Sequence, residues 1–434
     1  MNTRNDKFLK KTNSLLFVVL LLMVACFFTW SENVGITRAI KVVGRMGVMI
    51  SSILIYRRIL NYGAVNSLLF KNIFSPILYF SYLLLGFISF LWSTNVGFSS
   101  LQWFMTFQSL VFAFYFIKSI ILLDIYFPGH TIRLYHLIGN TVFVLISIFV
   151  VGMFLSPDVF FRLTNGGEEA RLGGYIMNPN ELGMLSGVGV ACLIFDIYRD
   201  QNKVLTIIKL LIIFYALYMT GSRSSLIGAL LIIFFHINQS KNKNLKYAII
   251  IGMLIITPIA INKIIFKDGD SSRIEEVMSM TGRLPFWTAL ISEGLPREPL
   301  LGFGFMRIDY KEYFQSTHTY PGKMTHNTFM QVLMNLGFIG FTIVLFQLFF
   351  TIKGFLKEEK EKKLMLIGIL IPVIINSFTE FGIFGESNYG ILFYQLLIFS
   401  ISFKSRTFLT TSEKLLLARK RPEINIKQLN SNSK

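Results

Sequence analysis

The sequence predicts an all-α protein that crosses a membrane about twelve times and carries one large hydrophilic loop. Composition is the first observation: 53% of the 434 residues are hydrophobic and 15% are charged, whereas about 25% of the residues in soluble domains are charged. The second is the recurrence of apolar segments about 20 residues long, the length with which a helix crosses the hydrocarbon core of a bilayer. The third is residues 267–325, the one long hydrophilic stretch of the chain.

The N-terminal segment has the pattern of a signal peptide. Four basic residues precede its apolar run: Arg4, Lys7, Lys10 and Lys11. We interpret this run as an uncleaved first span, because no soluble domain follows it to be exported. The second span, near residues 39–56, has Lys41 and Arg45 in its first turns, so an amphipathic helix on the membrane surface is the alternative there.

The remaining apolar runs complete the predicted membrane domain. We expect spans near residues 14–30, 39–56, 73–92, 98–117, 134–155, 175–195, 204–219, 224–237, 247–266, 327–352, 364–378 and 389–403. The chain then divides into N-terminal membrane helices (1–266), a large external loop with short helices (267–325), C-terminal membrane helices (326–403) and a basic cytoplasmic tail (404–434).

The net charge of +18 could indicate a nucleic-acid partner, but the basic residues lie in short loops between spans and in the C-terminal tail. The positive-inside rule explains this distribution better, and we expect no nucleic acid. It predicts that both termini are cytoplasmic and that the 267–325 loop lies outside. Cys26 and Cys192 both fall in apolar runs, so no disulfide framework is indicated.

Arg171 leads into the sequence Asn178-Pro179-Asn180, where a proline between two asparagines predicts a helix start. An ordinary helix N-terminus is one interpretation. The other is a discontinuous helix whose exposed backbone lines a polar cavity.

Arg223 lies in a tight turn between two spans, among small hydroxyl residues. A basic side chain that reaches to the membrane interface is the ordinary interpretation. We favour a functional role, because basic residues are scarce in the predicted external turns and a guanidinium group binds phosphate oxygens in bidentate fashion.

In the large loop, Arg283 is followed at helical spacing by Trp287, which predicts a short amphipathic helix on the membrane. Gly302 and Gly304 form no dinucleotide fingerprint, because no strand–helix unit surrounds them, and we interpret them as a turn.

His326 and Asn327 open the next apolar helix. A lone histidine is more often a capping or interfacial residue, but an imidazole at the mouth of a span can also take a proton from a hydroxyl. His318 is the competing candidate in the same loop. No metal-binding cluster is visible, because the histidines are too scattered.

Together these motifs resemble the O-antigen ligase/polymerase superfamily of bacterial membrane glycosyltransferases, by their order over roughly residues 170–340 and by the single large external loop. The resemblance implies transfer of an oligosaccharide from an undecaprenyl-diphosphate carrier to an acceptor hydroxyl, without metal or nucleotide cofactor. It assigns the catalytic roles to Arg223 and Arg283, as cations for the leaving diphosphate, and to His326, as general base on the acceptor hydroxyl or as a residue that orients it. Substrate binding is assigned to the remaining motif residues, Arg171, Asn178, Asn180, Asn327 and Trp287.

Within this family we favour a polymerase that joins lipid-linked repeat units into O-antigen or a capsular or exopolysaccharide. The alternative is a ligase that moves the finished glycan onto lipid A-core or a protein. A transporter or flippase of the same lipid is a third interpretation. Such a protein would be expected to have charged residues within its spans and internal repeats, but the spans after the second are almost free of charge and no repeat is evident. The resemblance also implies the bacterial inner membrane as location, and membrane lipid, a chain-length regulator and a flippase as partners.

Overall fold

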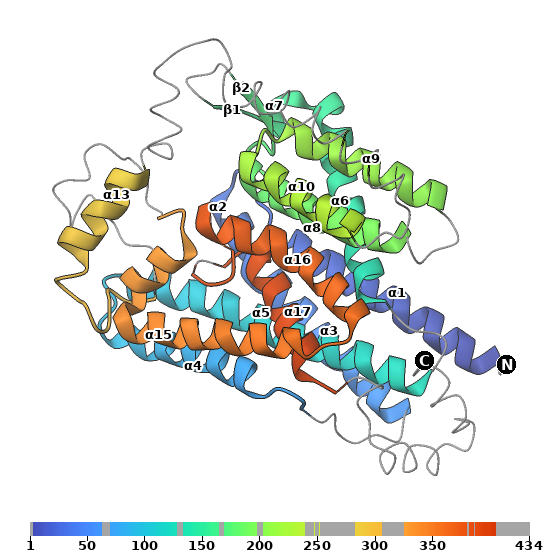
Figure 1. Ribbon diagram of the computed structural model, residues 1–434, viewed down its shortest axis with the longest axis horizontal. Coiled ribbons are helices and arrows are strands. Elements are labelled where there is room, and N and C mark those ends of the chain that lie inside the picture. Colours follow the sequence, from blue (N-terminus) through green and yellow to red (C-terminus); the bar gives the residue numbers. More distant parts are fainter. Residues whose placement is uncertain are drawn as a thin grey trace.

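Helices make up nearly all of the ordered architecture in the computed structural model, which describes residues 3–62, 70–127, 133–164, 169–197, 203–238, 247, 251, 283–305, 325–379, 382–385 and 387–404. Most helices run roughly side by side in a long bundle (Figure 1). A two-stranded antiparallel hairpin is the one sheet within these residues. The predicted all-α membrane fold is therefore confirmed.

The N-terminal half comprises α1 (Thr3–Ala25), α2 (Val34–Ala39), the π-helical η1 (Ile40–Gly44), α3 (Arg45–Tyr62), α4 (Phe74–Ile88), η2 (Ser89–Leu91), α5 (Val96–Tyr126), α6 (Leu134–Leu155), α7 (Pro157–Phe160), β1 (Phe161–Thr164) and β2 (Glu169–Leu172). The C-terminal half comprises α8 (Pro179–Ile197), α9 (Lys203–Met219), α10 (Arg223–Asn238), α13 (Arg283–Ala289), the π-helical η4 (Leu290–Gly294), α15 (Thr328–Leu356), α16 (Lys360–Thr379) and α17 (Tyr389–Ser402).

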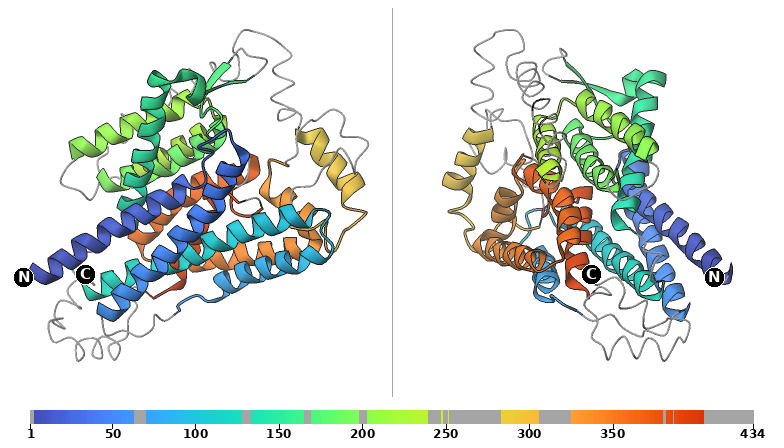
Figure 2. Two further views of the ribbon diagram at one scale, coloured as in Figure 1. Left: turned by 180° about the vertical axis from the view of Figure 1, so that it is seen from behind. Right: turned by 45° about the vertical axis from the view of Figure 1, so that its right-hand side comes forward.

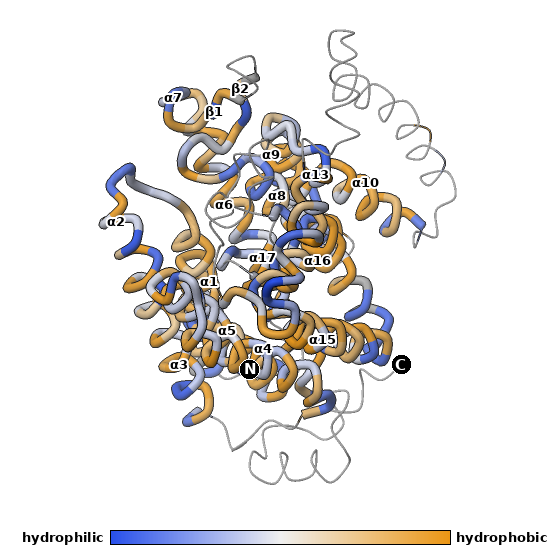
Figure 3. Tube along the Cα trace, turned by 90° about the vertical axis from the view of Figure 1, so that its left-hand side faces the viewer, coloured by the Kyte–Doolittle hydropathy of each residue, from blue (hydrophilic) through white to orange (hydrophobic). Residues whose placement is uncertain are grey.

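Seven helices within the described residues are long and apolar enough to cross a membrane, and three apolar helices are shorter. Each predicted span coincides with a helix, except the span at 247–266, which lies outside the described residues apart from 247 and 251. The number of twelve stays a prediction. Hydrophobic residues dominate along the helices, and hydrophilic stretches gather toward their ends (Figure 3).

The second predicted span is one apolar helix of 29 residues, Val34–Tyr62, which includes α2, η1 and α3. Asn33 caps its start, because the side-chain oxygen accepts hydrogen bonds from the amides of Gly35 and Ile36. Lys41 donates to the hydroxyl of Thr29, and Arg45 is buried. The helix therefore has the length and composition of a span rather than those of a short surface helix.

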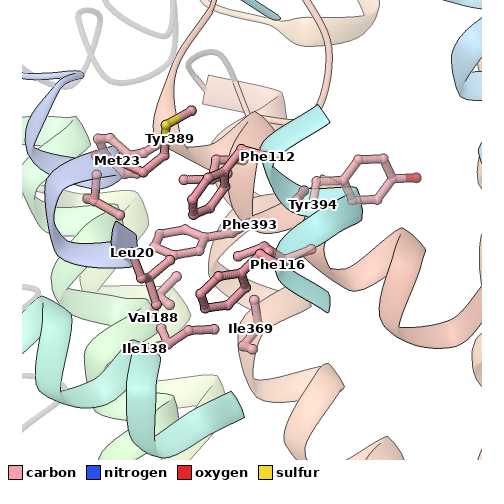
Figure 4. Close-up of a cluster of buried hydrophobic side chains, with 14 of the residues drawn as sticks. Leu20, Met23, Phe112, Phe116, Ile138, Val188, Ile369, Tyr389, Phe393 and Tyr394 are labelled. Carbon is pink, nitrogen blue, oxygen red and sulfur yellow. The ribbon is translucent and has the colours of Figure 1, made fainter. Parts of the chain in front are cut away.

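The core of the bundle forms where several helices bring apolar side chains together. Figure 4 shows Leu20 and Met23 of α1, Phe112 and Phe116 of α5, Ile138 of α6, Val188 of α8, Ile369 of α16 and Tyr389, Phe393 and Tyr394 of α17 in one cluster. Small residues permit close helix contacts beside it. A Cβ added to Gly187 of α8 would lie 3.2 Å from the Pro372 side chain of α16, which is the close approach that small residues give in membrane bundles.

One end of the bundle is fixed by a polar cluster where α15 ends and α16 begins. Glu358 is buried and lies 3.3 Å from Lys71 and 3.4 Å from Lys362. The amide of Lys71 also donates to the carbonyl of Ser402 at the end of α17. The helix α4 starts at this end, and α15 and α17 finish here. The starts of α5, α8, α10, α15 and α17 lie at the opposite end of the bundle (Figure 1).

α15 is discontinuous at Gly337, whose φ of 59° and ψ of −163° are not helical. The backbone groups freed at this break bond to residues of the preceding loop. Phe338 and Ile339 donate to the carbonyls of Pro299 and Leu300. In return the amides of Phe303 and Gly304 donate to the carbonyls of Met334 and Asn335. Backbone away from water must be satisfied internally, so this segment completes the broken helix.

The turn expected at Gly302 and Gly304 lies at residues 299–301, directly before these glycines, and both glycines contact α15 at its break. Both glycines have positive φ, and a Cβ at Gly302 would lie 2.5 Å from the backbone of Asn335. A discontinuity was one of two interpretations of the segment at Asn178, but α8 begins there as an ordinary helix. The discontinuous helix among the described residues is α15.

Candidate active site

The sequence-predicted site residues belong to β2, to α13 and to the starts of α8, α10 and α15. These elements lie toward the top and left of Figure 1. The helix α13 lies beyond the end of the bundle where these helices start and is joined to it by hydrogen bonds. Views from other directions show α13 beside the start of α15 as well (Figure 2). The prediction for His318, and those for most of the 267–325 loop, fall outside the described residues.

Arg171 on β2 joins three segments of this end. Its Nε donates to the carbonyl of Thr220 at 2.7 Å, and its Nη2 donates to Oδ1 of Asn180 at 2.7 Å. A forked guanidinium group suits such a bridge, because its donors are fixed in one plane. The hairpin, the α9–α10 turn and the first turn of α8 are thereby held together. Arg171 acts first as a structural clamp, and its predicted contact with substrate stays a prediction.

Asn178 and Asn180 shape the start of α8. The side-chain oxygen of Asn178 accepts a hydrogen bond from the amide of Asn180 at 2.9 Å, as a capping residue does. The carbonyl of Asn180 accepts a hydrogen bond from Ser225 of α10. A Cβ at Gly183 would lie 2.7 Å from Oγ of Ser225, so the first turns of α8 and α10 are in direct contact.

Arg223 is the first residue of α10, and its side chain is exposed. It makes no hydrogen bond and no ion pair with any residue in the described part of the chain. A basic side chain is unfavourable at a helix N-terminus, where the helix dipole is positive. The position therefore adds nothing to helix stability, and the guanidinium group is available to an anionic ligand.

Arg283 is likewise the first residue of its helix, α13. Its Nη1 donates to the carbonyl of Thr379, the last residue of α16. Cations are favourable at helix C-termini, so this contact orients the guanidinium group at the end of α16. Arg283 is half-buried.

Trp287 follows Arg283 by one helical turn and holds α13 against α15. Its indole Nε1 donates to the carbonyl of Thr325 at 2.7 Å. Phe286 and Leu290 pack with Phe303 and Met334 in a small apolar cluster that is separate from the main core of the bundle. The described part of the large loop thus contains the expected short helix.

His326 lies between Thr325 and the start of α15 with a φ of 50°. Among the residues that the structure describes, it is the one non-glycine residue with a positive φ. Left-handed backbone is uncommon for side chains other than Asn, Asp and His, and such outliers cluster at functional sites. The hydroxyl of buried Thr325 stabilises the turn, since it donates to the carbonyl of Asn327 at 2.9 Å.

Asn327 is the N-cap of α15. Its side-chain oxygen accepts hydrogen bonds from the amides of Phe329 at 2.9 Å and Met330 at 3.1 Å. This oxygen is occupied by the helix, so a contact with substrate would fall to the amide nitrogen of the side chain. The prediction that Asn327 binds substrate stays a prediction.

The connection between α16 and α17 belongs to this site and was not predicted from the sequence. The amide of Gly382 donates to Oγ1 of Thr328, the first residue of α15, at 3.0 Å. The hydroxyl of Tyr389 donates to the carbonyl of Glu181 in the first turn of α8. The glycines Gly382 and Gly385 and the asparagine Asn388 were the available sequence signals, because such residues mark turns and caps.

The architecture defines a polytopic membrane protein with several arginines and one strained histidine at one end of its helical bundle. A family model described as O-antigen ligase matches residues 208–345. This range includes Arg223, Arg283 and His326, and the match confirms the resemblance of the chain to the O-antigen ligase/polymerase superfamily. No curated protein matches the chain.

Proposed function

We propose that the protein is a membrane glycosyltransferase that joins undecaprenyl-diphosphate-linked oligosaccharide repeat units into a polysaccharide. The observation that carries this proposal is Arg223, an exposed cation without a partner among the described residues, at the same end of the bundle as Arg283 and His326. A diphosphate is the ligand class that such cations favour.

The reaction forms a bond between an acceptor hydroxyl oxygen and the anomeric carbon of the donor sugar, and breaks the bond from that carbon to the diphosphate. Negative charge develops on the departing diphosphate, and cations fixed before the reaction stabilise it. Arg223 would bind the diphosphate directly. Arg283, oriented by Thr379, would supply a second guanidinium group.

Helix dipoles add to this positive potential. The N-termini of α8, α10, α15 and α17 all lie at this end, and backbone amides at helix N-termini favour anions. The polyprenyl chain of the donor would remain among the exposed apolar side chains of the bundle, beside lipid.

His326 would take the proton of the acceptor hydroxyl as that oxygen attacks, or orient the hydroxyl for attack. Its fixed left-handed backbone directs the imidazole from a short turn rather than from within a helix. Fixed placement matters because general-base catalysis depends first on hydrogen-bond distance to the proton. The proposed reaction uses no metal and no nucleotide.

The proposed orientation in the membrane follows from the charge distribution. Basic residues gather in the loops and in the tail that the positive-inside rule assigns to the cytoplasm. We therefore propose cytoplasmic termini and a site on the external face, and from the family resemblance we propose the bacterial inner membrane as the location. The domain division at residues 266, 325 and 403 is part of the same proposal, as are a chain-length regulator and a flippase as partners.

A ligase is the second candidate, because the matched family model is described as O-antigen ligase. Liposomes that contain the purified protein separate the two activities. With the lipid-linked repeat unit alone, a polymerase builds a ladder of products. A ligase forms product only when lipid A-core or a protein acceptor is added. Translocation of the lipid without a new glycosidic bond would instead identify a transporter.

A further inference from the structure

Arg45 is a buried cation within an apolar helix. Its exposed fraction is 1%, and it lies at the first turn of α3 inside the 29-residue span Val34–Tyr62. Its guanidinium carbon is 3.7 Å from the centroid of the Phe27 ring, and its Nη1 donates to Oγ of Ser387 at 2.8 Å. It forms no ion pair with a residue in the described ranges. A charge buried in a membrane bundle is costly, so its presence there points to a function.

Ser387 belongs to the connection between α16 and α17, residues 382–385 and 387–388, here named the strap. Hydrogen bonds from the strap reach three further helices. Gly382 donates to Thr328 of α15, Gly385 to Tyr82 of α4, and Ser387 to Oε1 of Gln102 of α5. Ile383 and Phe384 of the strap are buried. The strap is therefore a fixed internal element, and the hydrogen bond from Arg45 to Ser387 joins it to α3.

Both ends of the strap meet residues of the proposed site. It follows α16, whose last residue, Thr379, accepts the hydrogen bond from Arg283. It ends at Asn388, which caps α17 through the amide of Ile391. Tyr389 comes next and bonds to the start of α8. A displaced strap would shift the acceptor of Arg283, the first residue of α15 and the start of α8 together.

We propose that Arg45 is a positioning residue for the transfer reaction, which it supports by holding the strap through Ser387. The inference rests on the proposed function. The planar guanidinium group can stack on Phe27 and donate to Ser387 at the same time, whereas a lysine ammonium group supplies charge without that fork. Charge alone would therefore not replace Arg45.

Three variants in the liposome assay test this proposal: Arg45→Lys, Ser387→Ala and the double variant. We expect each to lower kcat by about 10- to 100-fold, because small misplacements of reacting groups have effects of that size. KM should change less than kcat, since the residues do not touch the donor. The double variant should lose no more activity than the more impaired single variant, because both changes break one interaction.

Arg57→Lys is the matched control, since Arg57 is exposed near the other end of the same helix. Its kcat should equal that of the wild type. Wild-type kcat in Ser387→Ala, or losses that add in the double variant, would overturn the proposal. If Arg45→Lys does not fold, Ser387→Ala decides alone, with its melting temperature measured in detergent. Absence of transfer by both wild type and control would refute the proposed function itself.

Discussion

Replacement of Arg223 by alanine should separate stability from activity more clearly than any other change at the site. The side chain is exposed, and it makes no hydrogen bond or ion pair within the described residues. Alanine removes a cation from the positive end of α10, an effect worth about 0.3–1 kcal/mol in favour of the folded state. The melting temperature should therefore stay constant or rise slightly.

Transfer activity should fall steeply in the same variant. Removal of one fixed donor to a developing negative charge lowers kcat by about 10²- to 10³-fold, or roughly 2.7–4 kcal/mol. Arg223→Lys should recover part of the loss, because an ammonium group keeps the charge but not the bidentate geometry. The assay is product formation in liposomes from the lipid-linked repeat unit, with melting temperatures measured on the same preparations.

Arg38→Ala is the control, since Arg38 is also exposed and lies in α2 near the same end of the bundle. It should transfer at the wild-type rate. The reasoning fails if Arg223→Ala keeps wild-type activity. It also fails if the lost activity is matched by a large fall in melting temperature, because the side chain would then support the fold rather than the reaction.

Three further changes test neighbouring features of the site. His326→Gly should abolish transfer yet keep or raise the melting temperature, because glycine adopts a φ of 50° without steric penalty; a stable variant that still transfers would exclude the general base. Asn327→Ala should lower stability by about 1 kcal/mol in thermal unfolding, since it removes the N-cap of α15, and an unchanged melting temperature would contradict the cap. Gly337→Ala should lower stability by about 1–3 kcal/mol or more, because its φ is positive and a Cβ would lie 2.3 Å from the carbonyl of Leu300; normal unfolding would show that the break in α15 can relax.

The sequence predicted the helices well because each signal for them is local. Long apolar runs set the positions of the spans, and an asparagine directly before a run marks where a helix begins. Asn33, Asn95, Asn327 and Asn388 all act as N-caps with their side-chain oxygens. The sequence also predicted that Arg223, Arg283 and His326 lie at the same end of the bundle, because the alternation of spans determines on which side of the membrane each turn lies.

The break in α15 and the strap depend on contacts between residues far apart in the sequence, so local patterns could not reveal them. Gly337 lies in a run that is apolar on both sides. Its conformation is set by the Pro299–Phe305 segment, which arrives from the large loop. Arg45 was similarly compatible with a membrane span or, as the alternative, with a surface helix, and its contact with Ser387 could not be predicted. The sequence signal was a charged residue within an apolar run, but the sequence did not indicate which residue that charge would contact.

Two arginines, Arg223 at the site and Arg45 beside the strap, are placed where they do not help the fold. Arg223 and Arg283 begin helices whose dipoles are positive at that end, and Arg45 is buried without an acidic partner among the described residues. The placements of Arg223 and Arg45 oppose stability, whereas Arg283 is stabilised by its hydrogen bond to Thr379 at the C-terminus of α16. Arg223 begins its helix where several helix N-termini converge. An anion at this end would offset that unfavourable potential. A site that is electrostatically unfavourable when empty is suited to bind a diphosphate and, because its cations are fixed beforehand, to stabilise the charge that develops as the glycosidic bond breaks.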